Sequence, residues 1–344
     1  MSTKVERHSK NTDSPAVIRA NSLSKSFDDV NAIRNSSFHI FEGSTTALVG
    51  ANGCGKSTLL KMLYGLCIPD KGEVSICGHN PFQTPKHLYS FARYLSQQIS
   101  LDGEMTGEES LLFFAKLYGI PPSKINQQLS SITQHFGLSE ILTRRIANLS
   151  GGMKQRIHLS ICLLGESSVM LLDEPTSNLD PDGKREFWSW AKGYSKSGGT
   201  IILSTHDLKN AESHASQVIM LDQGSIILDE PPEKIVQQHS RPIIFATTEN
   251  RELAQKAKIT LETTEFIKSV DILDENQIVI VLSNADTRSN DAAVMAELQK
   301  NAVSLQSYRR ETGLASAYYL LAGRRSEIHA REGLSRGRAR GRRH

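Results

Sequence analysis

Three short apolar runs stand out along the chain, and none of them alternates apolar with polar positions. The runs are Thr45–Val49, Val169–Leu172 and Thr200–Ser204. Such runs are typical of strands that a parallel sheet buries on both faces. Residues with candidate chemistry follow each run at once, as expected when a site forms where parallel strands end. The pattern therefore predicts an α/β fold with a mostly parallel sheet and a site along one of its edges.

Helical spacing dominates between about residues 102 and 166. The predicted helices cover Leu111–Tyr118 and Ile125–Phe136, Pro121 and Pro122 lie between them, and a stripe of Met153, Ile157, Ile161 and Leu164 ends at Gly165. Proline interrupts a helix, and glycine commonly follows its last residue. We expect these segments to form a helical insert within the α/β core.

The pattern changes again after residue 240. Strands are predicted at Pro242–Phe245 and Ile278–Leu282, and helices at Glu252–Lys258 and Ala292–Asn301. These elements predict a small C-terminal α/β appendage over residues 241–323. Residues 1–16 and 324–344 are expected to be disordered tails. The main domain is therefore expected over residues 17–240.

The composition predicts a folded chain without a membrane span. Of the 344 residues 38% are hydrophobic, and the mean hydropathy is −0.33. No apolar run reaches the ~18 residues that a transmembrane helix needs. The N-terminus has no apolar signal-peptide core, so a cytosolic location is expected. The four cysteines form no CxxC pair, so free thiols are expected rather than a zinc site.

Positive charge is concentrated at the C-terminus. The net charge is +3, but residues 324–344 alone hold eight Arg and two Glu, so the rest of the chain sums to about −3. Three interpretations of this Arg-rich tail stay open. It can be a solvated end, contact anionic lipid headgroups, or contact RNA, although no aromatic residues are interleaved with the arginines.

Gly50–Thr58 fits the phosphate-loop pattern G-x-x-x-x-G-K-[ST]. Glycines let such a loop turn its backbone N–H groups toward phosphates. Lys56 can reach the β- and γ-phosphates, and Ser57 can ligate Mg²⁺. The candidate nucleotide-binding residues here are Asn52, Gly53, Gly55, Lys56, Ser57 and Thr58.

Two adjacent carboxylates, Asp173 and Glu174, close the second apolar run. Asp173 suits Mg²⁺, directly or through water. Glu174 can accept a proton from an attacking water or orient it. An alternative interpretation is an acidic cap of the following helix.

The octapeptide Leu149–Arg156, with the sequence LSGGMKQR, is the most informative segment of the chain. Ser150 can cap the helix that Gly151 and Gly152 open, which leaves backbone N–H groups available to an anion. With the phosphate loop and the carboxylate pair, this segment resembles the nucleotide-binding subunits of ATP-binding-cassette (ABC) transporters. The resemblance covers roughly residues 17–240 and implies a P-loop NTPase core with an antiparallel β subdomain.

The resemblance implies roles for further residues. Phe27 occupies the place of an aromatic that stacks on adenine, although a lone Phe can also be a core residue. Gln97 corresponds to a glutamine that senses Mg²⁺ and the attacking water, and its neighbour Gln98 is the alternative residue for that place. Asp180, a further candidate nucleotide-binding residue, belongs to a loop that crosses the dimer interface. His206 corresponds to a histidine that contacts the γ-phosphate, although a His after a strand can also be structural.

The family's signature binds ATP held by the opposite subunit. The resemblance therefore implies that Ser150, Gly151 and Gly152 complete a partner's site, in a homodimer or in a heterodimer with a similar cassette. ATP and Mg²⁺ are the implied ligands, and the catalytic set is Lys56, Gln97, Glu174 and His206. The metal-binding set is Ser57, Gln97 and Asp173.

The implied function is ATP hydrolysis that powers transport through separate integral membrane permease subunits, at the cytoplasmic face of the membrane. Gly78–Pro81, the LSGGM form of the signature and the appendage resemble drug and polysaccharide exporters, which favours export. Thr106 and Glu109 lie where the family contacts its membrane partner. The alternative is a soluble cassette protein acting on ribosomes or nucleic acid. A P-loop kinase is disfavoured by the signature and by His206.

Overall fold

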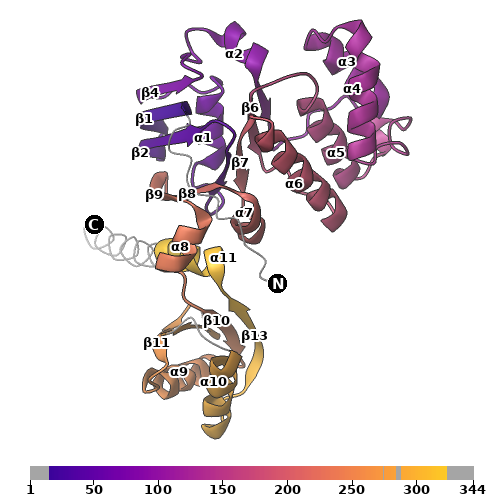
Figure 1. The fold of residues 1–344 in the computed structure, drawn as a ribbon. Coiled ribbons are helices and arrows are strands. Elements are labelled where there is room, and N and C mark those ends of the chain that lie inside the picture. The colour runs from indigo at the N-terminus through magenta and orange to yellow at the C-terminus, as the bar shows by residue number, and fades with distance from the viewer. Residues whose placement is uncertain (1–14, 274, 284–287, 324–344) are drawn as a thin grey trace, which may run out of the picture. The chain divides into compact units, whose positions relative to one another are not determined.

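The computed structural model describes residues 15–273, 275–283 and 288–323 (Figure 1). The predicted tails at residues 1–16 and 324–344 lie outside this range, apart from Pro15 and Ala16, and Ala16 already begins a strand. The described chain forms two compact units. The first holds residues up to His206 together with His214–Asp229, and the second holds Asp207–Ser213 and the chain from Glu230 onward. The division therefore falls earlier than the predicted residue 240.

A six-stranded sheet of order β5-β6-β7-β3-β8-β9 organises the first unit. Its strands are β3 (Thr45–Val49), β5 (Ala92–Leu95), β6 (Val169–Asp173), β7 (Thr200–Thr205), β8 (Gln217–Asp222) and β9 (Ser225–Glu230). The neighbours β5 to β6, β6 to β7, β7 to β3 and β3 to β8 pair in parallel. Every residue of β3, β6 and β7 is buried, which confirms the prediction made from the three apolar runs.

A second, antiparallel sheet of order β2-β1-β4 completes the core of this unit. It is formed by β1 (Ala16–Phe27), β2 (Val30–Phe41) and β4 (Lys71–Ile76). Helix α1 (Lys56–Leu63) lies between the two sheets, and its Leu59, Leu60 and Leu63 join one buried apolar cluster with both of them. Helix α2 (Pro85–Phe91) leads into β5. The predicted antiparallel β subdomain is therefore present.

The predicted helical insert is also present. It contains α3 (Gly107–Leu117), α4 (Pro122–His135), a 3₁₀ turn at Ile146–Asn148 and α5 (Gly151–Cys162), and α6 (Pro181–Lys196) follows β6. Helix α3 begins four residues before the predicted start. Thr106 accepts from the backbone N–H of Glu109, while the Glu109 carboxylate accepts from the N–H of Thr106. This capping box satisfies backbone donors that the apolar pattern does not reveal.

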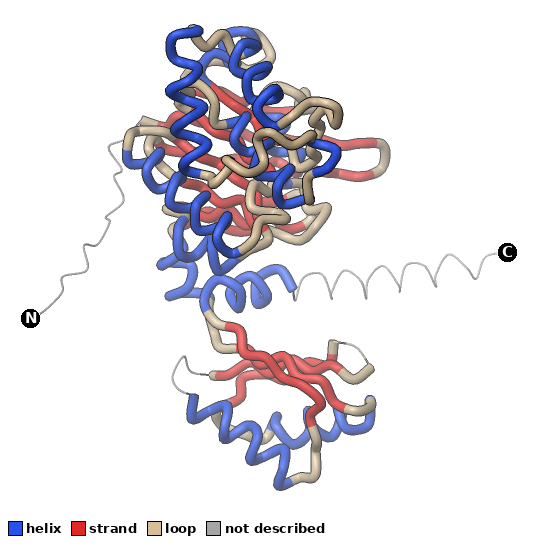
Figure 2. The backbone as a smooth tube through the Cα atoms, turned by 90° about the vertical axis from the view of Figure 1, so that its right-hand side faces the viewer, coloured by secondary structure: helices blue, strands red, loops and turns tan. Residues whose placement is uncertain are grey.

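The second unit contains a four-stranded antiparallel sheet of order β11-β12-β10-β13. The chain order is β10 (Ile243–Thr248), α9 (Arg251–Glu262), β11 (Ile267–Ile272), β12 (Gln277–Leu282), α10 (Arg288–Lys300) and β13 (Leu305–Glu311). This βαββαβ order is the ferredoxin-like topology. Helices α9 and α10 cover one face of the sheet (Figure 2). The sequence predicted four of these six elements and missed β11 and β13.

The other face of this sheet meets the end of the described chain. After α11 (Gly313–Tyr318), the π-helical turn Tyr319–Gly323 places Tyr319 and Leu320 against Ile243, Val279 and Val281. Helices α7 (Leu208–His214) and α8 (Pro232–His239) belong largely to this unit. No helix in the described part of the chain combines the length and the apolar character that a membrane crossing requires.

Candidate nucleotide-binding and hydrolysis site

Four neighbouring strands of the first unit end at the predicted site residues. The phosphate loop follows β3, the carboxylate pair closes β6, His206 follows β7 and Gln97 follows β5. Because β5, β6, β7 and β3 are parallel neighbours, their carboxyl ends lie along the same sheet edge. The structure therefore brings these four segments together, although they are spread over more than a hundred residues of sequence.

The phosphate loop is a tight turn around a buried ammonium group. Lys56 Nζ donates to the carbonyl oxygens of Gly50, at 2.8 Å, and Ala51, at 3.1 Å. Gly55 has φ +110°, and a Cβ there would meet the carbonyl of Ala32, so only glycine fits. Asn52 and Gly53 are exposed, while Ser57 and Thr58 are half-buried in the first turn of α1. The loop thus presents backbone N–H groups and one cation to an anionic ligand.

Ser204 holds the two carboxylate residues in place. Its hydroxyl donates to Asp173 Oδ1 at 2.6 Å and accepts from the backbone N–H of Glu174 at 2.9 Å. Asp173 and Glu174 are both buried. Helix α6 begins only at Pro181 and is capped by Asp180, so the carboxylates are not the cap of that helix. A buried, oriented pair of this kind fits a metal ligand and a general base.

Glu174 also contacts His206 and carries an unusual backbone conformation. His206 Nδ1 lies 2.9 Å from Glu174 Oε2, and the histidine side chain is 69% exposed. Glu174 has φ +51°, in the left-handed region that costs a non-glycine residue about 1–2 kcal/mol. Strain of this kind concentrates where function needs a side chain in one direction. The contact of His206 with a γ-phosphate stays a prediction.

Phe27 and Gln97 are both accessible at the ends of their strands. Phe27 closes β1 and is 49% exposed, with Lys25 Nζ 5.4 Å from the ring centroid. The interpretation of Phe27 as a core residue is therefore wrong. Gln97 is exposed just beyond β5. Their predicted contacts with adenine and with Mg²⁺ stay predictions.

Helix α5 opens on the signature segment. The Ser150 hydroxyl accepts from the backbone N–H of Met153 at 3.3 Å, which confirms the predicted cap. Gly151 is exposed. A Cβ on Gly152 would lie 2.7 Å from the carbonyl oxygen of Asn178, so a side chain there would push the two segments apart. The signature helix and the loop before α6 therefore touch within one chain.

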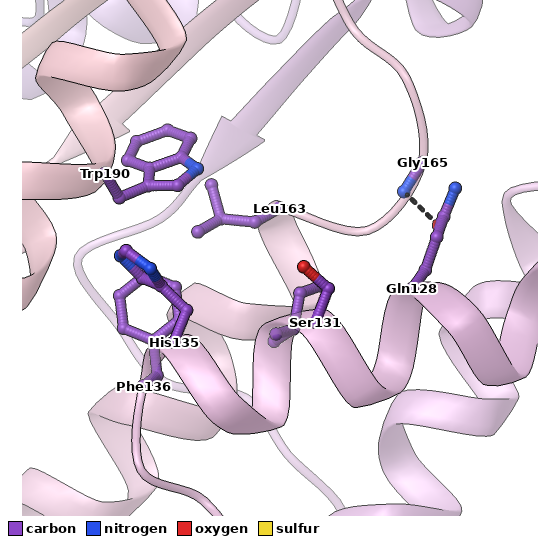
Figure 3. A pocket seen from close by; sticks show the side chains of 8 residues that line it. Gln128, Ser131, His135, Phe136, Leu163, Gly165 and Trp190 are labelled. Atoms are coloured by element: carbon purple, nitrogen blue, oxygen red, sulfur yellow. Dashed lines mark hydrogen bonds between the residues drawn. The ribbon is translucent and has the colours of Figure 1, made fainter.

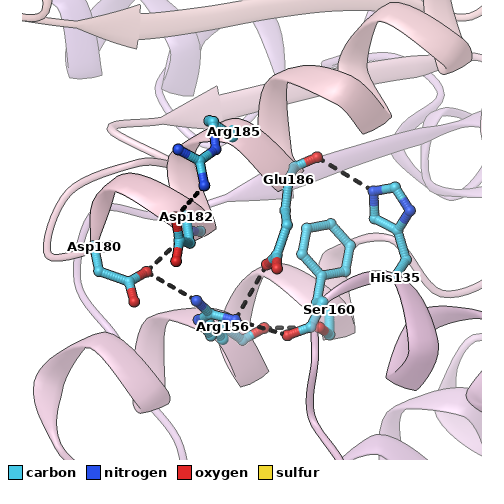
Figure 4. A network of polar contacts seen from close by, with 9 residues as sticks. His135, Arg156, Ser160, Asp180, Asp182, Arg185 and Glu186 are labelled. Carbon is cyan, nitrogen blue, oxygen red and sulfur yellow. Dashed lines mark hydrogen bonds and ion pairs between the residues drawn. The ribbon is translucent and has the colours of Figure 1, made fainter.

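A polar network that the sequence did not predict joins the same two segments (Figure 4). Arg156, the last residue of the signature, lies in α5 and pairs with Asp180 at 2.8 Å and with Glu186 at 3.1 Å. The hydrogen bond from the Arg156 guanidinium is the largest cause that lowers the pKa of the Asp180 carboxyl, and the hydrogen bond from the backbone N–H of Gly183 is the second. Gln155 is buried and donates to the carbonyl of Pro175 at 2.9 Å. Asp180, predicted as a nucleotide-binding residue in a loop that crosses the dimer interface, thus has contacts within its own chain.

A separate cavity of about 260 Å³ lies beside α4 and α6 (Figure 3). Trp190, Phe136 and Leu163 contribute its apolar wall, and Gln128 accepts from the backbone N–H of Gly165 at 3.0 Å. None of the predicted site residues lines this cavity. It is therefore distinct from the sheet edge described above.

The sheet edge also fits a divalent cation. The Asp173 carboxylate keeps acceptor positions beyond the one that Ser204 occupies, and it is an oxygen ligand of the kind that Mg²⁺ prefers. The described residues contain no group of three or more His, Cys, Asp or Glu side chains that could hold a metal alone. The arrangement therefore suits a cation that is shared with a phosphate-bearing ligand.

Fold and site together define a P-loop protein that binds a nucleoside triphosphate at the edge of a parallel sheet. Comparison with known proteins narrows this class. The family model described as "ABC transporter" matches residues 33–177. The Nod factor export ATP-binding protein I of Burkholderia pseudomallei (strain K96243) is 31% identical over 224 residues, which is 65% of this chain and 74% of that protein. The chain therefore belongs to the ATP-binding proteins of ABC transporters.

A second relative is longer than this chain. The probable multidrug ABC transporter ATP-binding protein YbhF of Escherichia coli (strain K12) is 33% identical over 227 residues. That alignment covers 66% of this chain, which spans only 39% of the length of YbhF.

Solved structures agree with the fold. An ATP-binding subunit of an ABC transporter superimposes with a TM-score of 0.61 at 29% identity, covering 64% of this chain and 92% of that one. The dimeric post-hydrolysis state of the cassette MJ0796 bound to ADP and Pi gives a TM-score of 0.57 at 22% identity, covering 62% and 98%.

Proposed function

We propose that this protein binds and hydrolyses ATP and so powers export through separate membrane permease subunits. The observation that carries the proposal is the shared sheet edge, at which the strands leading to Lys56, Asp173, Glu174 and His206 end. One named relative supports the direction of transport, since it is called a Nod factor export ATP-binding protein.

The roles follow from the chemistry of each side chain. When ATP binds, Lys56 Nζ donates to the β- and γ-phosphates in place of the carbonyl oxygens of its own loop. Glu174 takes a proton from the attacking water or orients it, and His206 stabilises charge on the γ-phosphate. Phe27 offers an exposed ring to adenine. Ser57, Asp173 and Gln97 would hold Mg²⁺, which neutralises the phosphate charge.

The working unit in this proposal is a dimer. The N–H groups that open α5 at Gly151 and Gly152 are not needed by the chain's own phosphate loop, and they suit the γ-phosphate held by a second cassette. The MJ0796 neighbour, a dimer in its post-hydrolysis state, supports this assembly. ATP favours the closed dimer because it binds that state better than the open one, and hydrolysis releases it.

The partners in this proposal are integral membrane permeases, which would hold the chain at the cytoplasmic face of the membrane. The capping box of Thr106 and Glu109 fixes the start of α3, and the exposed Phe113 and Leu117 in the second half of that helix offer an apolar contact. Action on ribosomes or nucleic acid is the second candidate. Only the Arg-rich sequence after Arg324 favours it, and that segment lies outside the described residues.

The experiment replaces Glu174 by Gln, which keeps the size of the side chain and the contact with His206 but removes the base. Turnover should fall by at least about 100-fold while ATP binding persists. An ATP-dependent dimer should accumulate in size-exclusion chromatography. Normal turnover would refute the role of Glu174, and co-purification with ribosomes instead of a membrane protein would refute the transport role.

A further inference from the structure

A cavity in the second unit combines a basic rim with an apolar wall. Its volume is about 230 Å³, which is smaller than the cavities that hold drug-sized ligands. It opens on the face of the β10–β13 sheet that α9 and α10 leave uncovered, because its floor includes Val281 from the cluster on that face.

Three elements contribute the basic rim. His239 ends α8, Arg241 follows it and Lys268 comes from β11. No carboxylate is among the described residues that line the cavity. Two permanent cations that face one space without a lining counter-ion repel each other and favour an anion between them.

The wall is apolar and continuous with the core. Val281 is fully buried, and Leu320 and Leu321 of the last helical turn are half-buried beside it. Leu320 also packs on the buried cluster of Ile243, Val279 and Val281. An apolar group of a ligand would remove this wall from water.

The sequence is rich in arginine after the last residue that lines the cavity. Arg324 follows Leu321 by three residues, and it is the first of eight arginines between position 324 and the C-terminus.

We propose that this cavity binds a small amphipathic anion. A single carboxylate, phosphate or sulfonate head pairs with Arg241 and Lys268, and a short apolar body lies on Val281, Leu320 and Leu321. The inference uses no residue of the nucleotide site and stands independently of the function proposed above.

The test uses the full chain saturated with ADP, so that the phosphate loop is already occupied. The probe is 8-anilinonaphthalene-1-sulfonate, whose fluorescence rises in an apolar site. Replacing Arg241→Gln together with Lys268→Gln should weaken its binding at least about tenfold. The matched control is Arg251→Gln with Lys256→Gln, two exposed cations of α9, which should change the affinity by less than about twofold.

Two results would overturn the proposal. One is equal affinity for the probe in both double variants. The other is equally tight binding of the neutral analogue N-phenyl-1-naphthylamine to the unmodified chain, since the charged rim would then recognise nothing.

Competition distinguishes the two sources of such an anion. Displacement of the probe by soluble octanesulfonate alone supports a free small molecule. Displacement by vesicles of phosphatidylcholine with phosphatidylglycerol, but not by phosphatidylcholine alone, supports a lipid headgroup. If neither competitor displaces the probe, the cavity does not select amphipathic anions and the proposal is wrong.

Discussion

The Arg156 guanidinium pairs with the Asp180 carboxylate across 2.8 Å, and this contact ties the signature helix to the start of α6. The same guanidinium donates to Glu186 Oε2 at 3.1 Å and to the carbonyl of Phe136 at 3.0 Å. Its side chain is only 17% exposed, so one cation fixes three elements. The geometry between the signature and the loop after the carboxylates therefore depends on Arg156.

Replacing Arg156 by Met should lower turnover much more than stability. Asp180 is 60% exposed and solvent screens the pair, so the loss of unfolding free energy should be about 1 kcal/mol. ATPase activity should fall at least about tenfold, because small misplacements of site elements are costly. The control Arg185→Met removes an exposed pair with Asp182 within α6 and should leave turnover near normal. Equal losses in the two variants would contradict this role.

Replacing Ser204 by Ala should affect both stability and the response to Mg²⁺. The change leaves the N–H of Glu174 unpaired in a buried site, which costs about 1–3 kcal/mol. It also removes the hydroxyl that orients Asp173, so the Mg²⁺ concentration for half-maximal turnover should rise about 10- to 100-fold. Urea unfolding and a Mg²⁺ titration measure the two effects. Ser197→Ala, at an exposed hydroxyl that caps α6, is the control and should shift neither.

Cys54 lies in the phosphate loop, and its modification should block ATP binding. Burial raises the pKa of its thiol, and only 5% of the residue is exposed. Since the thiolate is the reactive form, N-ethylmaleimide should label Cys54 more slowly than the half-buried Cys67. Bound ATP should slow the labelling of Cys54 further and leave Cys67 unchanged. Mass spectrometry of the labelled peptides reads both rates, and normal ATP binding by protein modified at Cys54 would contradict the placement of the loop.

His158 should make the cassette less stable in mild acid. Burial lowers its pKa to about 4, from an ordinary value of 6.5. Below pH 6.5 the unfolded chain takes up a proton there while the folded chain does not. The contribution of neutral His158 to the free energy of unfolding is therefore complete above pH 6.5. It is lost as pH falls through about 4, and the total loss is up to about 3 kcal/mol. His158→Gln removes this dependence, so the stability difference between the two proteins should change between pH 7 and 4. Parallel urea-unfolding profiles would contradict it.

Local patterns predicted the elements that are buried on one or both faces. Thr45–Val49 and Thr200–Ser204 agree with β3 and β7 almost to the residue, because a strand buried on both faces needs an unbroken apolar run. Strand β13 was missed because Leu305–Glu311 lies at a sheet edge with mostly exposed polar side chains, so its sequence has no apolar pattern that would predict a strand. Strand β11, at the opposite edge, was missed because its apolar residues Ile267, Val270 and Ile272 do not follow the strict alternation that predicts a half-buried strand.

The sequence alone predicted the candidate residues of the site. Lys56, Asp173, Glu174 and His206 are recognisable because each follows a buried strand, and Ser150 because a cap is a local feature of its helix. Only the tertiary structure decided how these groups are held. The Ser204 bridge, the Arg156 to Asp180 pair and the basic cavity of the second unit join residues between 24 and more than 50 positions apart. Such contacts depend on the order of strands and the packing of helices, which no local spacing encodes.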